Sequence, residues 1–344
     1  MKPSDLVFMN AFLKIGAKQG IKGEREHRRP RGPFRMRAVR TSIFAIGLCL
    51  LMTCMSAHGA VVDLSASFEQ PVSTKGGGRT LLVEEITATG CSTCAEIDPE
   101  LLRVADSHGS RIALVALHPS TTADAFQPEA SKERIERLEI TQSGLNQTPT
   151  FLVESGAARR GYDAWQDVQR DILNEEVSRQ ITSKIDVSVV KTERGYRASV
   201  AHADLVQING TQLTMMVVQH GKIVPEGALN VGLDHRDRVL VGMAECSLEN
   251  NTVIRAIDVQ NASVGESCAD SFAVEFENYE SWSVVLVHES TEEELHEGGR
   301  INTYGVVELA HRDRAEVNPS SSLAGRVLLV SCVMLAVASI LRKK

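Results

Sequence analysis

Hydrophobic and polar residues follow two different patterns along this chain, and the first pattern occupies residues 79–176. There, short apolar runs typical of buried strands alternate with longer segments whose apolar residues recur at helical spacing. The run 112–117 is apolar throughout, which suits a strand buried on both faces of a parallel sheet. This alternation predicts an α/β layer fold. The predicted strands are residues 79–86, 111–118 and 150–154, and the predicted helices are residues 91–107, 128–141 and 163–176.

Two of these helical segments also carry end and face signals. Gly109 follows the first of them, where a glycine commonly caps the C-terminus of a helix. In the segment 163–176, the side chains of Trp165, Val168, Ile172 and Leu173 are expected on one apolar side.

The second pattern begins near residue 181 and consists of short, often alternating segments. Turn signals such as Asn209-Gly210 separate them. So many short strands within about 130 residues predict an antiparallel, sandwich-like β domain. The chain therefore divides into a linker at 61–78, an α/β domain at 79–180 and an all-β domain at 183–312. The predicted strands of the second domain are residues 185–190, 196–203, 212–219, 238–243, 251–258, 271–277, 281–288 and 301–309.

The N-terminal residues 1–60 read as a basic extension followed by a signal peptide. Residues 41–62 contain no Asp, Glu, Lys or Arg, and Arg35, Arg37 and Arg40 precede them. Small residues between Ser56 and Ala60 suit cleavage, so the segment predicts secretion. An uncleaved signal anchor is the alternative, and Met36 would serve as an alternative start.

The C-terminal residues 323–344 read as a membrane anchor with a basic tail. Residues 327–341 are uncharged and residues 342–344 are Arg-Lys-Lys. A span starting at residue 323, with Arg326 reaching the interface, approaches the length that a bilayer requires. Residues 313–322 form the predicted stalk. A trimmed sorting signal and a buried helix are the alternatives for this segment.

Charge and cysteine content fit a protein whose body lies outside the cytoplasm. The net charge is −7, and residues 1–40 alone carry +8, which leaves −15 on the remainder. Such an acidic body argues against a nucleic-acid partner. Outside the two terminal segments the cysteines are Cys91, Cys94, Cys246 and Cys268. An even number of exported cysteines predicts one reactive and one structural disulfide, the latter between Cys246 and Cys268, with two free buried thiols as the alternative.

The sequence Cys91-Ser92-Thr93-Cys94 carries the clearest chemistry. It lies between a predicted buried strand and a predicted helix. Two cysteines three residues apart on a first helical turn can close a disulfide, and the N-terminus of a helix stabilises a thiolate. The pair therefore predicts a thiol–disulfide redox site.

The segment 79–176 resembles the thioredoxin superfamily. Residues 82–94, Leu-Val-Glu-Glu-Ile-Thr-Ala-Thr-Gly-Cys-Ser-Thr-Cys, look like the family's strand and active-site helix entry. Pro99 lies where the family has a proline in that helix, and Thr148-Pro149-Thr150-Phe151 looks like its cis-proline segment. The chain departs from the family at Gly90, where thioredoxins usually have tryptophan.

The resemblance implies a role for each residue. Cys91 would attack a substrate disulfide, and Cys94 would resolve the mixed disulfide. Glu85 would be the buried acid that accepts the Cys94 proton, and Thr148 and Pro149 would bind the substrate backbone. No cofactor and no resident metal are expected.

These features predict an extracytoplasmic thiol–disulfide oxidoreductase, held at the cell membrane by a single C-terminal span. It would work as a reductase, an oxidase or an isomerase. Its partners would be protein thiols and disulfides and a membrane electron donor or acceptor. The alternatives are a surface binding or scaffold protein with a non-catalytic Cys pair, and a copper-delivery protein that uses His118 with Cys91 and Cys94.

Overall fold

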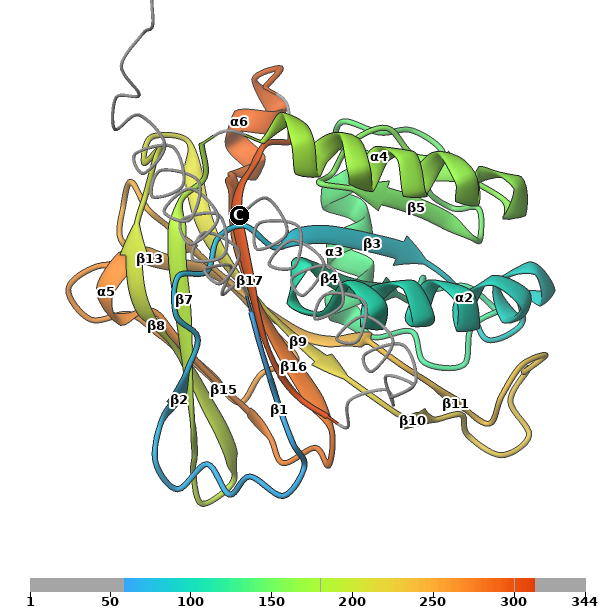
Figure 1. Ribbon diagram of the computed structural model, residues 1–344, viewed down its shortest axis with the longest axis horizontal. Coiled ribbons are helices and arrows are strands. Elements are labelled where there is room, and N and C mark those ends of the chain that lie inside the picture. Colours follow the sequence, from blue (N-terminus) through green and yellow to red (C-terminus); the bar gives the residue numbers. More distant parts are fainter. Residues whose placement is uncertain (1–58, 180, 300, 313–344) are drawn as a thin grey trace, which may run out of the picture. The chain divides into compact units, whose positions relative to one another are not determined.

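The computed structural model describes residues 59–179, 181–299 and 301–312 (Figure 1). This part of the chain is a mixed α/β structure made mostly of strands in several sheets. Almost all of the predicted signal segment, and the predicted stalk and anchor at 313–344, lie outside the described residues. Within the described ranges, none of the helices combines the length and hydropathy that a membrane span requires.

The helices and strands of residues 79–180 lie close to their predicted positions. The strands here are β3 (Leu81–Ile86), β4 (Ile112–Leu117), β5 (Thr150–Val153) and β6 (Arg159–Arg160). The helices are α2 (Ser92–His108), α3 (Glu129–Glu139) and α4 (Trp165–Ser178), with single 3-10 turns at Gly109–Arg111 and Tyr162–Ala164. Gly109 caps α2 with φ 61°, as its position after the helix predicts.

The remaining elements are strands with two short helices. The strands are β1 (Ala60–Val62), β2 (Val72–Ser73), β7 (Lys184–Lys191), β8 (Gly195–Asp204), β9 (Thr211–Gln219), β10 (Lys222–Ile223), β11 (His235–Arg236), β12 (Val239–Ser247), β13 (Thr252–Ile257), β14 (Asn261–Ser263), β15 (Ala273–Glu277), β16 (Trp282–Ser290) and β17 (Thr303–His311). The helices are α5 (Cys268–Ser271) and α6 (Glu292–His296).

Ten strands form one sheet in the order β1-β17-β16-β9-β12-β4-β3-β5-β6, with β13 paired to β12. The α/β and β-rich halves meet inside this sheet, where β12 runs parallel to β4. The joint is short: Val239 is opposite Ala116, and the Ala116 N–H donates to the carbonyl of Arg238 at 2.8 Å. The two predicted domains therefore share a continuous sheet.

The segment 61–78, predicted as a linker, contributes a strand to each of the two sheets of the β-rich half. β1 runs parallel to β17, and β2 runs antiparallel to β7. Between them the Phe68 ring is buried and packs on Tyr196 and Trp282. The segment thus adds apolar surface to the core.

A second sheet, β14-β15-β8-β7-β2, packs against the β-rich part of the first. Side chains of β7, β8 and β15 share one hydrophobic cluster with side chains of β9, β12, β16 and β17. Cys246 and Cys268 are disulfide-bonded within this cluster, with Cα atoms 5.9 Å apart.

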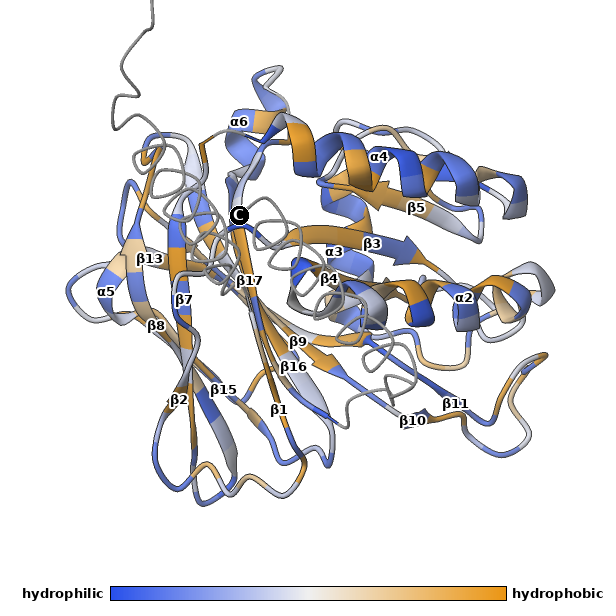
Figure 2. Ribbon diagram, viewed as in Figure 1, coloured by the Kyte–Doolittle hydropathy of each residue, from blue (hydrophilic) through white to orange (hydrophobic). Residues whose placement is uncertain are grey.

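The strand β3 is buried along its whole length, and its side chains alternate between two helical layers. Leu81 and Val83 pack with α2 and α4 on one face of the sheet. Leu82 and Ile86 pack with α3 on the other. Figure 2 shows the hydrophobic start of β3 giving way to a hydrophilic stretch, which is Glu84 and Glu85.

The apolar side of α4 is narrower than the sequence predicts. Trp165, Val168 and Ile172 are buried, but Leu173 is 56% exposed. The expectation for Leu173 was wrong because it lies about 100° around the helix from Ile172 and faces away from the sheet.

Candidate active site

The Cys91–Cys94 pair lies at the N-terminus of α2. Cys91 is the N-cap residue, and the two cysteines are disulfide-bonded with Cα atoms 5.2 Å apart. The backbone N–H of Cys94 donates a hydrogen bond to Sγ of Cys91 at 3.1 Å. A cap sulfur that accepts from the first helical turn is stabilised as a thiolate by that hydrogen bond and by the helix dipole.

The two sulfurs differ in their access to solvent. Cys91 is half-buried, whereas Cys94 is 1% exposed. A substrate disulfide can therefore approach Cys91 more readily than Cys94.

Thr148 and Pro149 lie at the end of the sheet from which the chain leaves for Cys91. Ile86, the last residue of β3, is opposite Thr150, the first residue of β5. The Thr148–Pro149 peptide bond is cis. The Pro149 carbonyl accepts a hydrogen bond from the N–H of Gly161. Within the described part of the chain, the Thr148 backbone neither donates nor accepts a hydrogen bond. The Thr148 backbone is thus available to an incoming strand.

The adjacent residues Glu84 and Glu85 point to opposite faces of β3. Glu84 faces α3, where its carboxylate accepts a hydrogen bond from Arg134 Nε at 2.6 Å. Glu85 follows the Leu81 and Val83 side chains toward α2 and is 3% exposed. Only Glu85 therefore lies on the side of the sheet that carries the Cys pair.

The neighbour of Glu85 is another acid, Asp98 of α2, and their carboxyl groups share a hydrogen bond. Burial, the charge of Asp98 and this hydrogen bond raise the pKa of Glu85 well above its usual value. Burial also raises the pKa of Asp98, but the hydrogen bond from Glu85 and the charges of Arg236 and His118 oppose that rise. The pKa of both carboxyl groups is therefore raised, and more strongly at Glu85, so Glu85 holds a proton more readily than Asp98.

Asp98 was missed as a site residue by sequence reasoning, although a signal was present. It lies four residues after Cys94, so the two share one side of α2. An acid at that spacing in the first turns of a redox helix could have been selected. Its contact with Glu85 depends on the packing of α2 on β3, which the sequence pattern alone does not specify.

His118 lies at the end of β4 and is fully buried. Its Nδ1 is 2.7 Å from Asp124 Oδ1, and Asp124 also accepts from the N–H groups of Thr89, Phe126 and Gln127. Burial would raise the pKa of Asp124, but the hydrogen bond and charge of His118 and these backbone donors hold it below its usual value. The described ranges contain no cluster of three or more His, Cys, Asp or Glu side chains suited to a metal.

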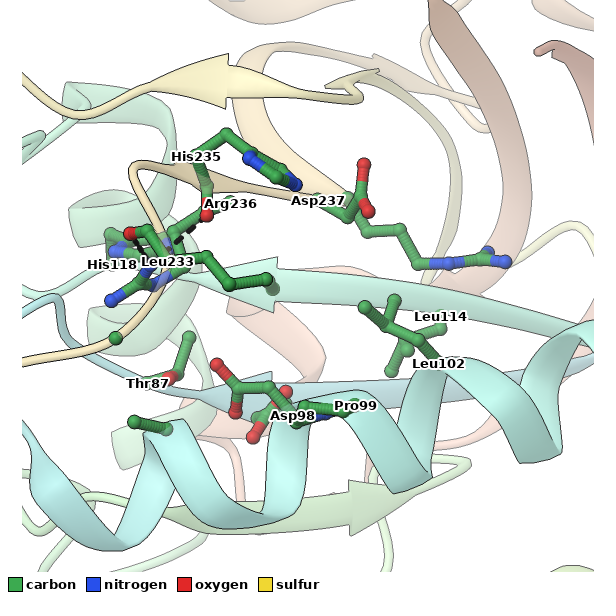
Figure 3. A pocket seen from close by; sticks show the side chains of 15 residues that line it. Thr87, Asp98, Pro99, Leu102, Leu114, His118, Leu233, His235, Arg236 and Asp237 are labelled. Carbon is green, nitrogen blue, oxygen red and sulfur yellow. Dashed lines mark hydrogen bonds between the residues drawn. The ribbon is translucent and has the colours of Figure 1, made fainter. Parts of the chain in front are cut away.

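A cavity of about 90 Å³ lies between the Glu85–Asp98 pair and His118. Asp98 projects into it from α2, and His118 and Arg236 approach from the opposite side (Figure 3). The loop that joins β10 to β11, together with β11 itself, forms much of its wall. The β-rich half thus contributes directly to the surroundings of the redox pair.

The same loop explains why glycine occupies position 90. A Cβ on Gly90 would lie 2.6 Å from Cδ2 of Leu229 and 2.8 Å from the carbonyl of Ala123. The loop is held there by hydrogen bonds from the Val231 N–H and Arg236 to the Thr89 carbonyl. Leu229 therefore lies against Gly90, and it is 55% exposed.

Comparisons with known proteins add little to this geometry. No protein-family model matches the chain, and no curated protein matches it. HBP35 of Porphyromonas gingivalis is similar with a TM-score of 0.44 and 12% identity, over 68% of this chain and 76% of that one. Protein AGR_C_4864 from Agrobacterium tumefaciens is similar with a TM-score of 0.41 and 12% identity, over 69% and 96%. Likenesses at this level carry no argument about the site.

Proposed function

We propose that this protein is an extracytoplasmic thiol–disulfide oxidoreductase that acts on protein substrates through Cys91 and Cys94. The observation that carries the proposal is the hydrogen bond from the Cys94 N–H to Sγ of Cys91 at a helix N-terminus. The α/β half would then be a thioredoxin-like domain at 79–180, followed by a sandwich-like domain at 183–312. The anchor at 323–344 would hold both on the outer side of the cell membrane.

The reaction would proceed through a mixed disulfide. The Cys91 thiolate attacks one sulfur of a substrate disulfide, which forms a Cys91–substrate bond and releases the other sulfur as a thiolate. Cys94 loses its proton to the ionised form of Glu85 and attacks Sγ of Cys91. The Cys91–Cys94 disulfide forms, and the substrate leaves with two reduced sulfurs. Run in reverse, the same steps oxidise a dithiol.

Equilibration with a redox buffer tests this function. We expect the Cys91–Cys94 pair of the purified full-length protein to exchange with glutathione or dithiothreitol, because Cys91 is accessible and its thiolate is stabilised. A midpoint near about −270 mV would indicate a reductase, and one near about −120 to −180 mV an oxidase or isomerase. Thiol labelling followed by mass analysis would report the fraction reduced.

The control for that experiment lies in the same chain. Cys246 and Cys268 are enclosed in the hydrophobic cluster between the sheets and should remain oxidised throughout the titration. If Cys91 and Cys94 also failed to exchange at every potential, the oxidoreductase proposal would be rejected. The scaffold alternative would then replace it.

The loop between β10 and β11 gives a second prediction, about substrate size. Leu229→Ser removes an exposed apolar side chain beside Gly90, so turnover of a protein disulfide should fall. Burying one such side chain in a substrate contact contributes about 1.5 kcal/mol, which corresponds to roughly a tenfold change. Turnover of a small aromatic disulfide should stay within about twofold, because that reaction needs Cys91 alone. Steady-state rates with both substrates would be compared.

Ile254→Ser is the matched control for that variant. Ile254 is 50% exposed on β13, so the substitution removes similar apolar surface far along the sheet from α2. It should leave both rates unchanged. Equal losses in the two variants, or a loss with the small disulfide only, would contradict a substrate contact at Leu229.

A further inference from the structure

The cavity beside α2 contains several polar atoms without a protein hydrogen-bond partner. His118 Nε2 and Thr87 Oγ1 are buried and have none among the described residues. Glu85 Oε1 and Asp98 Oδ1 are equally buried, and within the described ranges no donor of another residue reaches them. Polar groups so enclosed nearly always bind one another or water. A cavity of about 90 Å³ has room for water with several such partners.

We propose that Asp98 and Glu85 hold one shared proton, and that water in this cavity relays protons between the pair and solvent. The inference rests on the proposed function, for which it supplies the proton route. Asp98 acts through Glu85 and is a positioning residue, because its hydrogen bond fixes Glu85 and its charge raises the pKa of this acid, which exchanges a proton with Cys94. His235 and Asp237 line the cavity and are partly exposed, so the relay would reach solvent beside them.

The position of Asp98 on α2 connects the pair to the redox centre. Cys94 and Asp98 are four residues apart, so their side chains lie one turn from each other along the same side of the helix. Cys94 is 1% exposed, and its proton therefore has no direct path to bulk water. The carboxyl pair, which borders both the buried side of α2 and the cavity, provides such a path.

The charged groups around the pair favour retention of one proton. Two carboxylates in contact cannot both ionise without strong repulsion, so one of them stays protonated. On the cavity side, Arg236 and His118 act on Asp98 and favour its ionised form. His235, Asp237 and Arg238 complete the cavity wall, and Asp124 is bonded to the far side of His118. The charge that most strongly affects Glu85 remains that of Asp98.

Asp98→Asn tests the inference in the full-length protein. Its Cys91–Cys94 midpoint potential should be measured from roughly pH 5.5 to pH 9.5. This range covers the pKa of a buried carboxyl whose pKa is raised and the pKa of an ordinary thiol. Because the Asp98 charge raises the pKa of Glu85, its removal lowers that pKa. The plot of potential against pH changes slope at the pH where Glu85 ionises. This break should therefore move to lower pH by about one unit or more. Glu100→Gln, which removes an acid from the exposed side of the same helix, should leave the break in place.

A second measurement needs no redox activity. In the oxidised wild type at neutral pH, infrared spectra should contain a protonated-carboxyl band that is lost in Glu85→Gln and shifted in frequency in Asp98→Asn, which replaces the hydrogen-bond partner of Glu85. An unchanged break together with an unchanged band in Asp98→Asn would overturn the inference. A protein whose disulfide never equilibrates would overturn the proposed function instead, while the infrared result would still decide whether the shared proton exists.

Discussion

Replacing Cys94 by serine should trap a covalent complex between Cys91 and a substrate protein, and multiple turnover should fall by at least about a thousandfold. The reason is that Cys91 can still attack a disulfide, while no second thiol is present to release the product. Non-reducing electrophoresis after mixing with an oxidised protein substrate would reveal the adduct. Reduction should release the substrate.

Cys91→Ser supplies the matched control. Its remaining thiol, Cys94, is 1% exposed and cannot reach a protein disulfide, so this variant should lose turnover without forming the adduct. The opposite pattern, with adducts in Cys91→Ser and none in Cys94→Ser, would contradict the assigned order of attack. Adducts in neither variant would contradict covalent chemistry at this pair.

Arg134→Met is expected to give the largest loss of stability, about 3–5 kcal/mol. Arg134 lies on α3 with no exposed side-chain surface and donates to Glu84 on β3 and to Glu289 on β16. Burial opposes its ionisation, but the charges of Glu289 and Glu84 raise the pKa of Arg134. Removing the guanidinium would leave Glu84 buried without its cation, and Glu289 would keep only Arg137, whose Nε lies 3.6 Å from Oε1. The free energy of unfolding, measured by urea denaturation, would report the loss.

Lys132→Met is the control on the same helix. Lys132 makes only a surface pair with Glu129, and exposed pairs contribute about 0–1 kcal/mol. An equal loss in the two variants would show that α3 itself, rather than the buried charge, determines the stability. A double variant, Arg134→Met with Glu84→Gln, should recover part of the loss, because it removes the carboxylate that the single variant leaves unpaired.

Much of the α/β half, residues 79–180, could be predicted because its signals are local. The apolar run of β3, the Cys pair at a helix start and the glycine at the end of α2 each act through neighbours in sequence. The same holds for the alternating strands of the β-rich half. Leu173 was misplaced because a one-residue step along a helix moves a side chain by about 100°, which a coarse apolar pattern does not resolve.

What the sequence could not supply are the contacts between distant segments. Asp98 meets Glu85 only because α2 packs across β3, and Leu229 meets Gly90 only because the β10–β11 loop folds back over the α/β half. The burial of Glu84 with Arg134 likewise depends on which face of β3 meets α3. Such contacts have no periodicity and no fixed spacing in the sequence, so they cannot be predicted from the pattern of residue types.

The pairing of β4 with β12 matters for any fragment that contains the α/β half alone. A fragment ending near residue 180 would carry the Cys pair and its strands but would lose the chain that covers β4 and the Thr89 turn. β4, which is apolar throughout, would lose its pairing at Ala116, and its open edge would be a template for association with other copies. The β-rich half therefore blocks part of an edge at which the isolated α/β half would be expected to associate with other copies.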